Sequence, residues 1–196
     1  MKELIVATRN RGKLTEISQL LGEYVNRILS LHDFPDLPEV IENGATFEEN
    51  ALIKATSAAL ATGRAVIADD SGLAVAALGG KPGVYSARFA GDGATDSENN
   101  EKLLLELSGV PPEQRLASFR CAIALCLPDG TKQTFRGELE GVILETARGS
   151  GGFGYDPLFL VQQYKKTLAE LPLDIKNRIS HRAIALNKLK SFLCNS

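Results

Sequence analysis

Short apolar runs alternate with helical patterns through the first 110 residues. The runs at 3–8, 27–31 and 65–70 each give way to polar or turn-forming residues, a pattern typical of buried strands. The last run, AVIADD, is expected to end at Ser71 and Gly72, because that pair favours a turn. Strands separated by helices indicate a sheet that is parallel in this part of the chain.

Three helices are predicted between and after these strands. Apolar residues recur at helical spacing over 10–22. Threonine followed three residues later by glutamate opens 46–62 and again 95–109, which resembles a capping box at the start of a helix. The segment 32–44, with two prolines and many acids, and the glycine-rich segment 79–94 are expected to be loops and turns.

The second half of the chain predicts a long β-hairpin, a strand and a final helix. The extended segments 115–127 and 132–143 are joined by Pro-Asp-Gly, as in a hairpin. PLFLV at 157–161 is a further strand, and Ser180 is expected to cap the last helix. We therefore expect an α/β fold with a mixed sheet, whose parallel part comes first and whose hairpin forms a second lobe, all within one domain spanning 1–196.

Composition limits the possible partners. The chain is 44% apolar and 23% charged, with a net charge of −2, and its basic residues are scattered. Polymeric nucleic acid is therefore not an expected partner, whereas the composition does not exclude a single nucleotide. The longest apolar runs are too short to span a membrane, and the N-terminus becomes polar too soon for a signal peptide, so we expect no membrane partner.

The cysteines point to a reducing compartment. Cys121, Cys126 and Cys194 are odd in number and lack metal-ligand spacing. Cys121 and Cys126 are five residues apart in an extended run, so they should face opposite sides of a sheet. We expect reduced, buried thiols in a cytoplasmic protein.

The stretch ATRNRGK, residues 7–13, leads from a predicted strand through a polar loop into a helix. A helix N-terminus offers free backbone N–H groups and positive potential, which suit a phosphate. Thr8 and Asn10 add hydrogen-bonding side chains, and Lys13 adds a cation. The spacing lacks the first glycine and the final Ser or Thr of a Walker-type loop. On its own, the motif is explained more simply by an asparagine N-cap and a solvated lysine.

Two adjacent carboxylates, Asp69 and Asp70, end the third apolar run. Neighbouring residues of a strand point to opposite faces, so only one of the two easily faces a given ligand. Such an acid could hold Mg²⁺ against phosphate oxygens or take a proton from water. An Asx turn, in which Asp70 bonds the backbone around Ser71, explains the pair equally well.

Polar residues around the second predicted helix have simple explanations. Glu48 and Glu49 lie in its first turn, where the helix dipole favours acids. Glu42 is typical of an exposed loop acid. Lys54 lies one turn after an asparagine on the same helix face, and a solvated face is the default interpretation of such a pair.

The stretch KNRISHRA places His181 and Arg182 at the start of the last predicted helix. Beside free backbone donors, these side chains could bind a carbonyl edge or an anion. A histidine at a helix start is otherwise unremarkable, so this signal is weak alone.

The stretch RGSGGFGYDPLF, residues 148–159, matches the pattern G-x-G-x-x-G through Gly149, Gly151 and Gly154. That fingerprint should follow a strand and open a helix. Here a proline and a predicted strand follow, so we do not expect a dinucleotide site. Glycines around Phe153 would instead bring the backbone close to a flat ligand, with the ring free to stack.

Taken in order, five motifs resemble one family, the inosine triphosphate pyrophosphatases, also called XTP/dITP diphosphatases. They are ATRNRGK, TFEENALIKA, IADDSGLAVAALGGKPGVYSARFAG, GGFGYDPLF and SHRAIAL, and they cover nearly the whole chain. The resemblance implies a two-lobed α/β fold on a long central sheet flanked by helices, usually homodimeric, with the site in the cleft between the lobes. It also implies Mg²⁺-dependent hydrolysis of ITP, dITP and XTP to the monophosphate and pyrophosphate.

By this resemblance, Asp70 is the proton acceptor and a metal ligand, and Glu42 and Asp69 are further metal ligands. The phosphates would lie against the first helix and the base against the glycine-rich loop and the last helix. The residues implied to bind substrate are Thr8, Arg9, Asn10, Arg11, Gly12, Lys13, Lys54, Ser71, Phe153, Gly154, Tyr155, Asp156, Lys176, His181 and Arg182.

Two positions depart from the family pattern. Arg9 stands where a small residue is expected between Thr8 and Asn10, and Ile175 stands where an acid often precedes the lysine. Three alternative functions remain: a Maf-like pyrophosphatase acting on pyrimidine or modified nucleotides, a nucleotide-binding regulator without turnover, and an aspartyl-phosphate phosphatase that uses DDSG. The Phe153 loop, with His181 and Arg182, argues against the first alternative. Asp70, Glu42 and Lys13 argue against the second.

Overall fold

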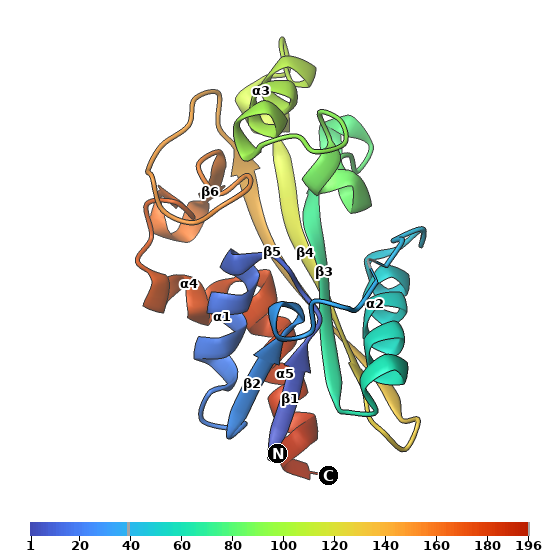
Figure 1. The fold of residues 1–196 in the computed structure, drawn as a ribbon. Coiled ribbons are helices and arrows are strands. Elements are labelled where there is room, and N and C mark those ends of the chain that lie inside the picture. The colour runs from blue at the N-terminus through green and yellow to red at the C-terminus, as the bar shows by residue number, and fades with distance from the viewer. Residues whose placement is uncertain (39, 196) are drawn as a thin grey trace. The chain divides into compact units, whose positions relative to one another are not determined.

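The computed structural model describes residues 1–38 and 40–195 (Figure 1). Its strands are β1 (Glu3–Val6), β2 (Arg27–Ser30), β3 (Val66–Val75), β4 (Leu116–Cys126), β5 (Lys132–Ile143), β6 (Phe159–Val161) and β7 (Lys166–Thr167). Its α-helices are α1 (Arg11–Leu21), α2 (Phe47–Thr62), α3 (Asp96–Glu106), α4 (Leu173–Ile179) and α5 (His181–Asn195).

The strands form a seven-stranded mixed sheet in the order β2-β1-β3-β4-β5-β6-β7. β1 pairs in parallel with β2 and β3, whereas β6 pairs in an antiparallel manner with β5 and β7. β4 and β5 are joined by a tight turn in which the Leu127 N–H donates to the Thr131 carbonyl. The predicted α/β class, mixed sheet and hairpin are therefore confirmed.

The chain divides into two compact units. The first contains 1–70, 121–137 and 181–196, and the second contains 71–120 and 138–180. Strands β3, β4 and β5 contribute residues to both units. The prediction that the hairpin forms the second lobe is wrong, because its turn end belongs to the first unit.

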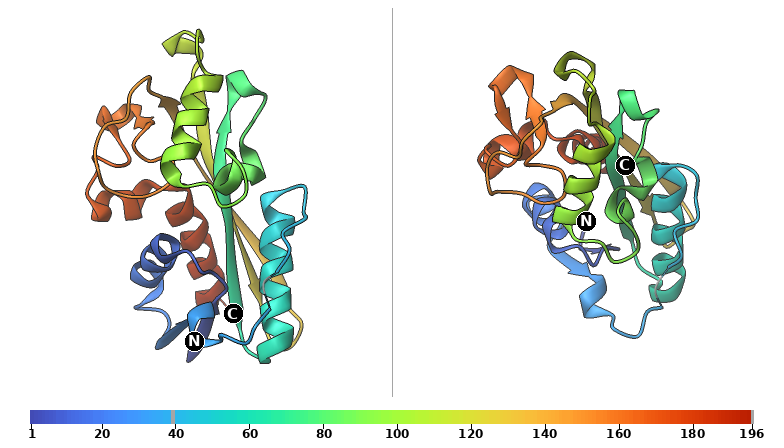
Figure 2. Two further views of the ribbon diagram at one scale, coloured as in Figure 1. Left: turned by 45° about the horizontal axis from the view of Figure 1, so that its top comes forward. Right: turned by 90° about the horizontal axis from the view of Figure 1, so that it is seen from above.

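In the first unit, helices cover both faces of the strands (Figures 1 and 2). Alternate strand residues such as Leu4 and Ile67 pack with α1 and α5, while their neighbours Ile5 and Ala68 pack with α2. Because side chains alternate along a strand, one strand supplies both cores. Cys121 lies in the first core and Cys126 in the second, as predicted.

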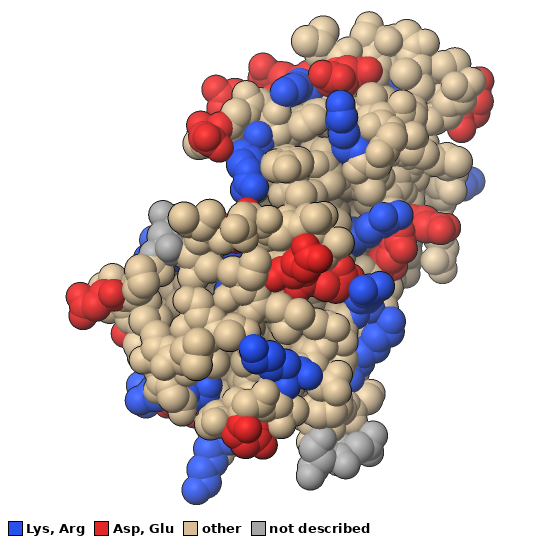
Figure 3. All heavy atoms as spheres, turned by 90° about the vertical axis from the view of Figure 1, so that its right-hand side faces the viewer, with Lys and Arg blue, Asp and Glu red and all other residues tan. Residues whose placement is uncertain are grey.

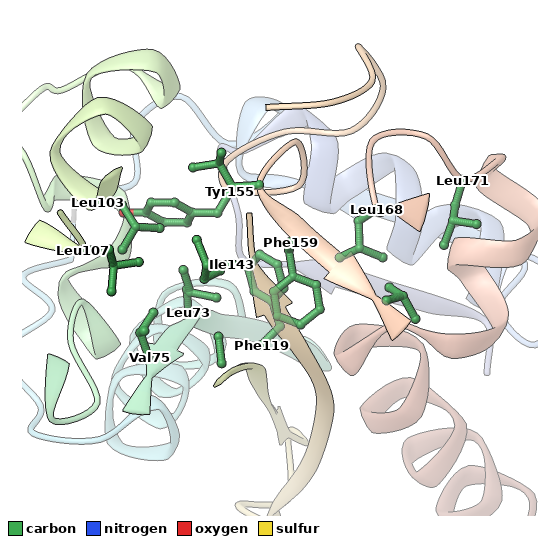
Figure 4. Close-up of a cluster of buried hydrophobic side chains, with 13 residues drawn as sticks. Leu73, Val75, Leu103, Leu107, Phe119, Ile143, Tyr155, Phe159, Leu168 and Leu171 are labelled. Atoms are coloured by element: carbon green, nitrogen blue, oxygen red, sulfur yellow. The ribbon is translucent and has the colours of Figure 1, made fainter. Parts of the chain in front are cut away.

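The second unit has its own core, which gathers residues from β3 to β6 and from α3 (Figure 4). The rings of Phe119 and Phe159 lie with their centroids 4.7 Å apart. Tyr155, from the glycine-rich loop, lies beside Leu103 and is buried in this core. Ile175 also packs against it, which explains an apolar residue at a position where the family pattern favours an acid.

The third strand is longer than predicted. β3 continues through Ser71 and Gly72 to Val75, so the expected turn at these residues is wrong. A Cβ at Gly72 would lie 2.3 Å from the Ser86 Oγ and 2.6 Å from the Gly83 carbonyl oxygen. The glycine therefore marks a close approach of two segments within a strand, a use that the sequence does not distinguish from a turn.

Helix caps follow the sequence closely. The Thr95 hydroxyl accepts from the Glu98 N–H, and the Glu98 carboxylate accepts from the Thr95 N–H, which completes a reciprocal capping box. At α2, Thr46 caps the helix in the same way, but Glu49 accepts from the Ala45 N–H. Neither α4 nor the two-residue β7 was predicted, because both are too short to produce a clear periodic pattern.

Surface features agree with the composition. Basic and acidic side chains are interspersed on the face shown in Figure 3. Among residues 1–38 and 40–195, no helix is both long and apolar enough to cross a membrane. All three cysteines are free thiols; Cys121 and Cys126 are buried, but Cys194 is exposed, contrary to expectation.

Candidate active site

Adjacent residues of β3 carry two different charged clusters in the first unit. Ile67 faces the core formed with α1 and α5, whereas Val66 and Ala68 face the core formed with α2. Alternation therefore directs Asp69 toward α1 and α5 and Asp70 toward α2. The opposed orientation predicted for the two carboxylates is confirmed by their separate partners.

The Lys54 cluster comprises Glu42, Asn50, Lys54 and Asp70. The Lys54 ammonium lies 2.8 Å from the Glu42 Oε2 and 2.9 Å from the Asp70 Oδ1. The Asn50 amide, also on α2, donates to the Asp70 Oδ2 at 3.3 Å and accepts from the Gly44 N–H through its Oδ1. Asp70 is therefore bound by side chains of α2 rather than in an Asx turn, and on the face shared by Asn50 and Lys54 the first is buried and the second half-buried.

The two carboxylates of this cluster differ in acidity. Burial raises the pKa of Asp70 to about 6, although Lys54 and Lys13 oppose this. Burial would also raise the pKa of Glu42, but the Lys54 ammonium outweighs it and the pKa is lowered. A carboxylate with a pKa near 6 is mostly ionised at neutral pH yet basic enough to accept a proton from water.

The same carboxylates have the chemistry of a divalent metal site. Glu42 and Asp70 bring hard oxygen donors to one cation, and Mg²⁺ is commonly held by one or two carboxylates together with phosphate oxygens. Among the residues that the structure describes, no three His, Cys, Asp or Glu side chains gather as a metal site, and Asp69 is paired with Lys13 and Arg182. The carboxylates of Glu42 and Asp70 are therefore a suitable pair of ligands for Mg²⁺.

The Asp69 cluster comprises Lys13, Glu16, Asp69, Cys121 and Arg182. The Lys13 ammonium lies 2.5 Å from the Asp69 Oδ1, and the Arg182 Nε lies 2.8 Å from the Asp69 Oδ2. The Cys121 thiol donates to the same Oδ2 at 3.1 Å. Arg182 also binds the Glu16 Oε2 through its Nη1 at 2.5 Å. Lys13 is therefore paired with a carboxylate and is not simply solvated.

Burial alone would raise the pKa of Asp69, but Arg182 and Lys13 outweigh it and hold this pKa well below its usual range. Burial and the negative charge of Asp69 raise the pKa of the Cys121 thiol. Asp69 is consequently a permanent anion and Cys121 a neutral hydrogen-bond donor. Glu16 was not singled out from the sequence, because its partner lies 166 positions away.

The N-terminus of α1 is built as the ATRNRGK motif predicts. Asn10 is the N-cap, and its Oδ1 accepts from the Lys13 N–H at 2.9 Å. The Thr8 Oγ1 accepts from the Asn10 N–H, while Arg11 and Gly12 form the first turn. Arg9 is exposed and reaches the Leu37 carbonyl, so it does not crowd the other motif residues.

In the second unit, the Phe153 loop (residues 152–156) is held by buried charges. The Asp156 Oδ2 accepts from the Phe153 N–H at 3.0 Å and from the Lys176 ammonium at 2.6 Å. That ammonium also lies 4.8 Å from the centre of the Phe153 ring. Gly152 and Gly154 have φ of 73° and 61°, values that favour glycine. The next element along the chain is β6, as the sequence predicts.

Helix α3 also fixes this loop. Its Asp96 carboxylate accepts from the Gly154 N–H at 2.7 Å, and its Asn100 amide donates to the Gly154 carbonyl at 2.9 Å. The Tyr155 hydroxyl donates to the Ser86 carbonyl at 2.8 Å. Tyr155 and Asp156 are therefore scaffold for Phe153. Sequence reasoning missed Asp96 and Asn100, whose position near a capping box was the only available signal.

A model of the Ham1 family matches residues 4–192. This chain belongs to the Ham1 family. A "dITP/XTP pyrophosphatase" from Geobacter sulfurreducens is 61% identical over 98% of this chain and 97% of its own. One of the same name from Bacillus cereus is 53% identical over 97% of this chain and 94% of its own.

Solved Ham1 structures have the same fold. The HAM1 protein from Coxiella burnetii superposes with a TM-score of 0.90, at 42% identity and with both chains fully covered. The Ham1 protein of Staphylococcus aureus gives a TM-score of 0.88 at 42% identity, with 99% of each chain covered. The resemblance to the XTP/dITP diphosphatases and the expected α/β fold are confirmed for this Ham1 family chain.

Proposed function

We propose that this chain hydrolyses deaminated purine nucleoside triphosphates, namely ITP, dITP and XTP, to the monophosphate and pyrophosphate. The observation that carries the proposal is the Lys54 cluster, in which a carboxylate with a raised pKa lies against a second carboxylate and a lysine. The names of the relatives from Geobacter sulfurreducens and Bacillus cereus support this substrate class.

In this mechanism the first unit binds the phosphates and activates water. Lys13 and the N-terminus of α1, with Thr8 and Asn10, supply positive charge and donors to the triphosphate. Lys54 and Ser71 are further substrate contacts. Asp70 accepts a proton from the attacking water. Glu42 and Asp70 would hold Mg²⁺, which would neutralise charge on the phosphate oxygens.

The Phe153 loop and His181 select the base. Phe153 stacks on the purine, and Lys176 holds the loop through Asp156. Hydrogen-bond donors near His181 that point at the 6-keto oxygen of the base would be left unpaired by the 6-amino group of adenine. ATP is therefore strongly disfavoured as a substrate.

We further propose that the protein is a cytoplasmic homodimer. Light scattering on the purified chain measures its oligomeric state.

One assay tests the function. The full chain is incubated with ITP, XTP, dTTP and GTP plus Mg²⁺, and the phosphorus products are identified. We expect pyrophosphate from ITP and XTP in preference to the other two substrates. Orthophosphate would indicate an aspartyl-phosphate phosphatase, preference for dTTP a Maf-like enzyme, and survival of all four nucleotides a binding protein without turnover.

The α3 contacts give a separate prediction about base binding. Asn100→Ala removes one hydrogen bond to the Gly154 carbonyl and loosens the Phe153 loop, which Asp96 and Asp156 still hold. Because such a bond contributes about 0.5–1.5 kcal/mol, we expect KM for ITP to rise roughly two- to tenfold with kcat little changed. Steady-state kinetics measures both constants. The control is Ser97→Ala, an exposed position on the same helix; an equal rise in KM there would remove the role of Asn100.

A further inference from the structure

The first half of the glycine-rich stretch, residues 148–151, lies against a turn of the second unit at residues 167–170, here termed the Thr167 turn. A Cβ at Gly149 would lie 2.6 Å from the Ala169 carbonyl carbon, and one at Gly151 would lie 2.9 Å from the Ala169 carbonyl oxygen. The two glycines are therefore required by the close approach of two backbone segments.

The Thr167 hydroxyl is the buried anchor of this contact. Thr167 is 0% exposed, and its Oγ1 donates to the Arg148 carbonyl at 2.7 Å. Beside this bond, the Gly151 N–H donates to the Ala169 carbonyl at 3.1 Å. Loss of one partner leaves the other group of a buried hydrogen bond unsatisfied, which is costly. The hydroxyl therefore holds the beginning of the glycine-rich stretch in place.

Glu170 closes the Thr167 turn. Its Oε2 accepts from the Thr167 N–H at 2.7 Å and lies 3.4 Å from the Arg148 Nη2. The Glu170 N–H donates in return to the Thr167 carbonyl at 3.0 Å. The Arg148–Glu170 ion pair is partly exposed, so the bond to the backbone N–H is the stronger contact of this carboxylate. Glu170 thus fixes the shape of the turn against which residues 148–151 pack.

The Thr167 turn also holds the far end of the stretch. Its Ala169 N–H donates to the Asp156 carbonyl at 3.3 Å. The Asp156 carboxylate in turn accepts from the Phe153 N–H and from the Lys176 ammonium. The Phe153 ring therefore lies on a segment whose two ends, at Arg148 and Asp156, are bound by the same turn. Fixing both ends before binding removes part of the entropic cost of ordering the segment around a ligand.

We infer that Thr167 and Glu170 are positioning residues that hold the Phe153 ring in place for the base of the substrate. They act through the backbone at Arg148 and Asp156. This inference rests on the proposed function and deepens it, because it makes base binding depend on a turn that lies in none of the five motifs.

Two substitutions of Thr167 separate its hydroxyl from its packing. Thr167→Val keeps the shape of the side chain and removes the donor, whereas Thr167→Ser keeps the donor and removes a buried methyl group. We expect Thr167→Val to raise KM for ITP about two- to tenfold, with kcat within about twofold of the wild-type value. Thr167→Ser should keep KM within about twofold of wild type although its Tm falls. A KM raised equally in both variants would contradict the inference.

Glu170 provides an independent pair of variants. Glu170→Ala removes the acceptor of the Thr167 N–H, so we expect KM for ITP to rise about two- to tenfold, whereas Glu170→Gln keeps an acceptor and should stay closer to wild type. Glu113→Ala, which removes an exposed acid of the same unit, is the matched control and should leave KM unchanged. A Glu170→Ala variant with the KM of this control would overturn the role of Glu170.

Two measurements without turnover separate the base from the phosphates. In calorimetric titrations of the full chain, Thr167→Val should bind IMP about two- to tenfold more weakly but should bind inorganic tripolyphosphate, which has no base, within about twofold of wild type. Amide hydrogen exchange over residues 149–156 should be faster in Thr167→Val and unchanged in Thr167→Ser. Unchanged exchange in Thr167→Val, or an equal loss of affinity for both probes, would contradict the inference.

Failure of this inference is distinguishable from failure of the proposed function. A wild type that releases no pyrophosphate from ITP would refute the proposed function, while hydrogen exchange and the IMP titration still decide the role of the Thr167 turn. If Thr167→Val does not fold, Glu170→Ala carries the test. Unfolding of both variants would assign the turn to stability alone and overturn the inference.

Discussion

Asp70→Asn is expected to lower kcat for ITP by about a hundredfold to ten-thousandfold, the range for loss of a general base. Asparagine keeps the size of the side chain and can still contact Lys54 and Asn50, but it cannot accept a proton from water. It also offers a weaker ligand to Mg²⁺. Measurement of pyrophosphate release at saturating ITP gives the effect, and a variant with at least half the wild-type rate would remove Asp70 from the mechanism.

The same substitution is expected to stabilise the protein at neutral pH. The folded-state pKa of Asp70, about 6, lies above the ordinary value of 3.8, so the folded chain holds this proton more tightly than the unfolded chain does. Asp70 therefore contributes to the free energy of unfolding a term that is fully present below about pH 4 and is lost as pH rises through about 6. Asparagine stays neutral and avoids this loss. We expect a gain of about 1–3 kcal/mol at pH 7.5 without divalent ions.

Thermal unfolding across pH checks this expectation. The gain corresponds to a Tm increase of roughly 3–10 °C for a chain of this length, and it should narrow as pH falls through about 6. Added Mg²⁺ should raise the Tm of the wild type more than that of the variant, because Asp70 is a proposed ligand. Asp92→Asn, an exposed position, is the control. A Tm gap that is constant from pH 4 to pH 8 would contradict the linkage.

Gly137→Ala is expected to destabilise the protein by about 3 kcal/mol or more, the upper range for overpacking. A Cβ at this position on β5 would lie 2.0 Å from the His181 carbonyl oxygen and 2.7 Å from the Ala185 N. Both atoms belong to the backbone of α5, so no side-chain rotation relieves the clash. The helix must move, and His181 and Arg182 move with it.

Calorimetric or spectroscopic melting measures this loss, for which we expect a Tm decrease of roughly 6–12 °C. Gln133→Ala, an exposed position on the same strand, is the matched control and should leave Tm nearly unchanged. A Gly137→Ala variant as stable as that control would show that β5 and α5 separate easily at this point.

The sequence predicted local features that depend on short-range physics. Alternation along one strand gave the opposite orientations of Asp69 and Asp70, and side-chain chemistry gave the caps at Asn10 and Thr95. The end of β3 was predicted wrongly, because Gly72 is required by the approach of another segment rather than by a turn. Such an approach is a property of the folded chain.

The candidate site could be predicted in part for the same reason. Lys13, Lys54 and Asp70 stood in motifs, but their partners did not follow from spacing. Glu16 resembles any acid on an exposed helix face until Arg182, 166 positions later, is placed against it. A buried ion pair between distant segments leaves no local signature, so its members look like surface residues in the sequence.

The single peptide bond between Asp69 and Asp70 limits how this protein could be re-engineered. Consecutive Cα atoms lie about 3.8 Å apart, and these two belong to a strand buried on both faces. A library that diversifies the contacts of one carboxylate will therefore shift the other, whatever property is selected. Changes of substrate preference are more safely sought at the Phe153 loop, which is anchored by residues outside both clusters.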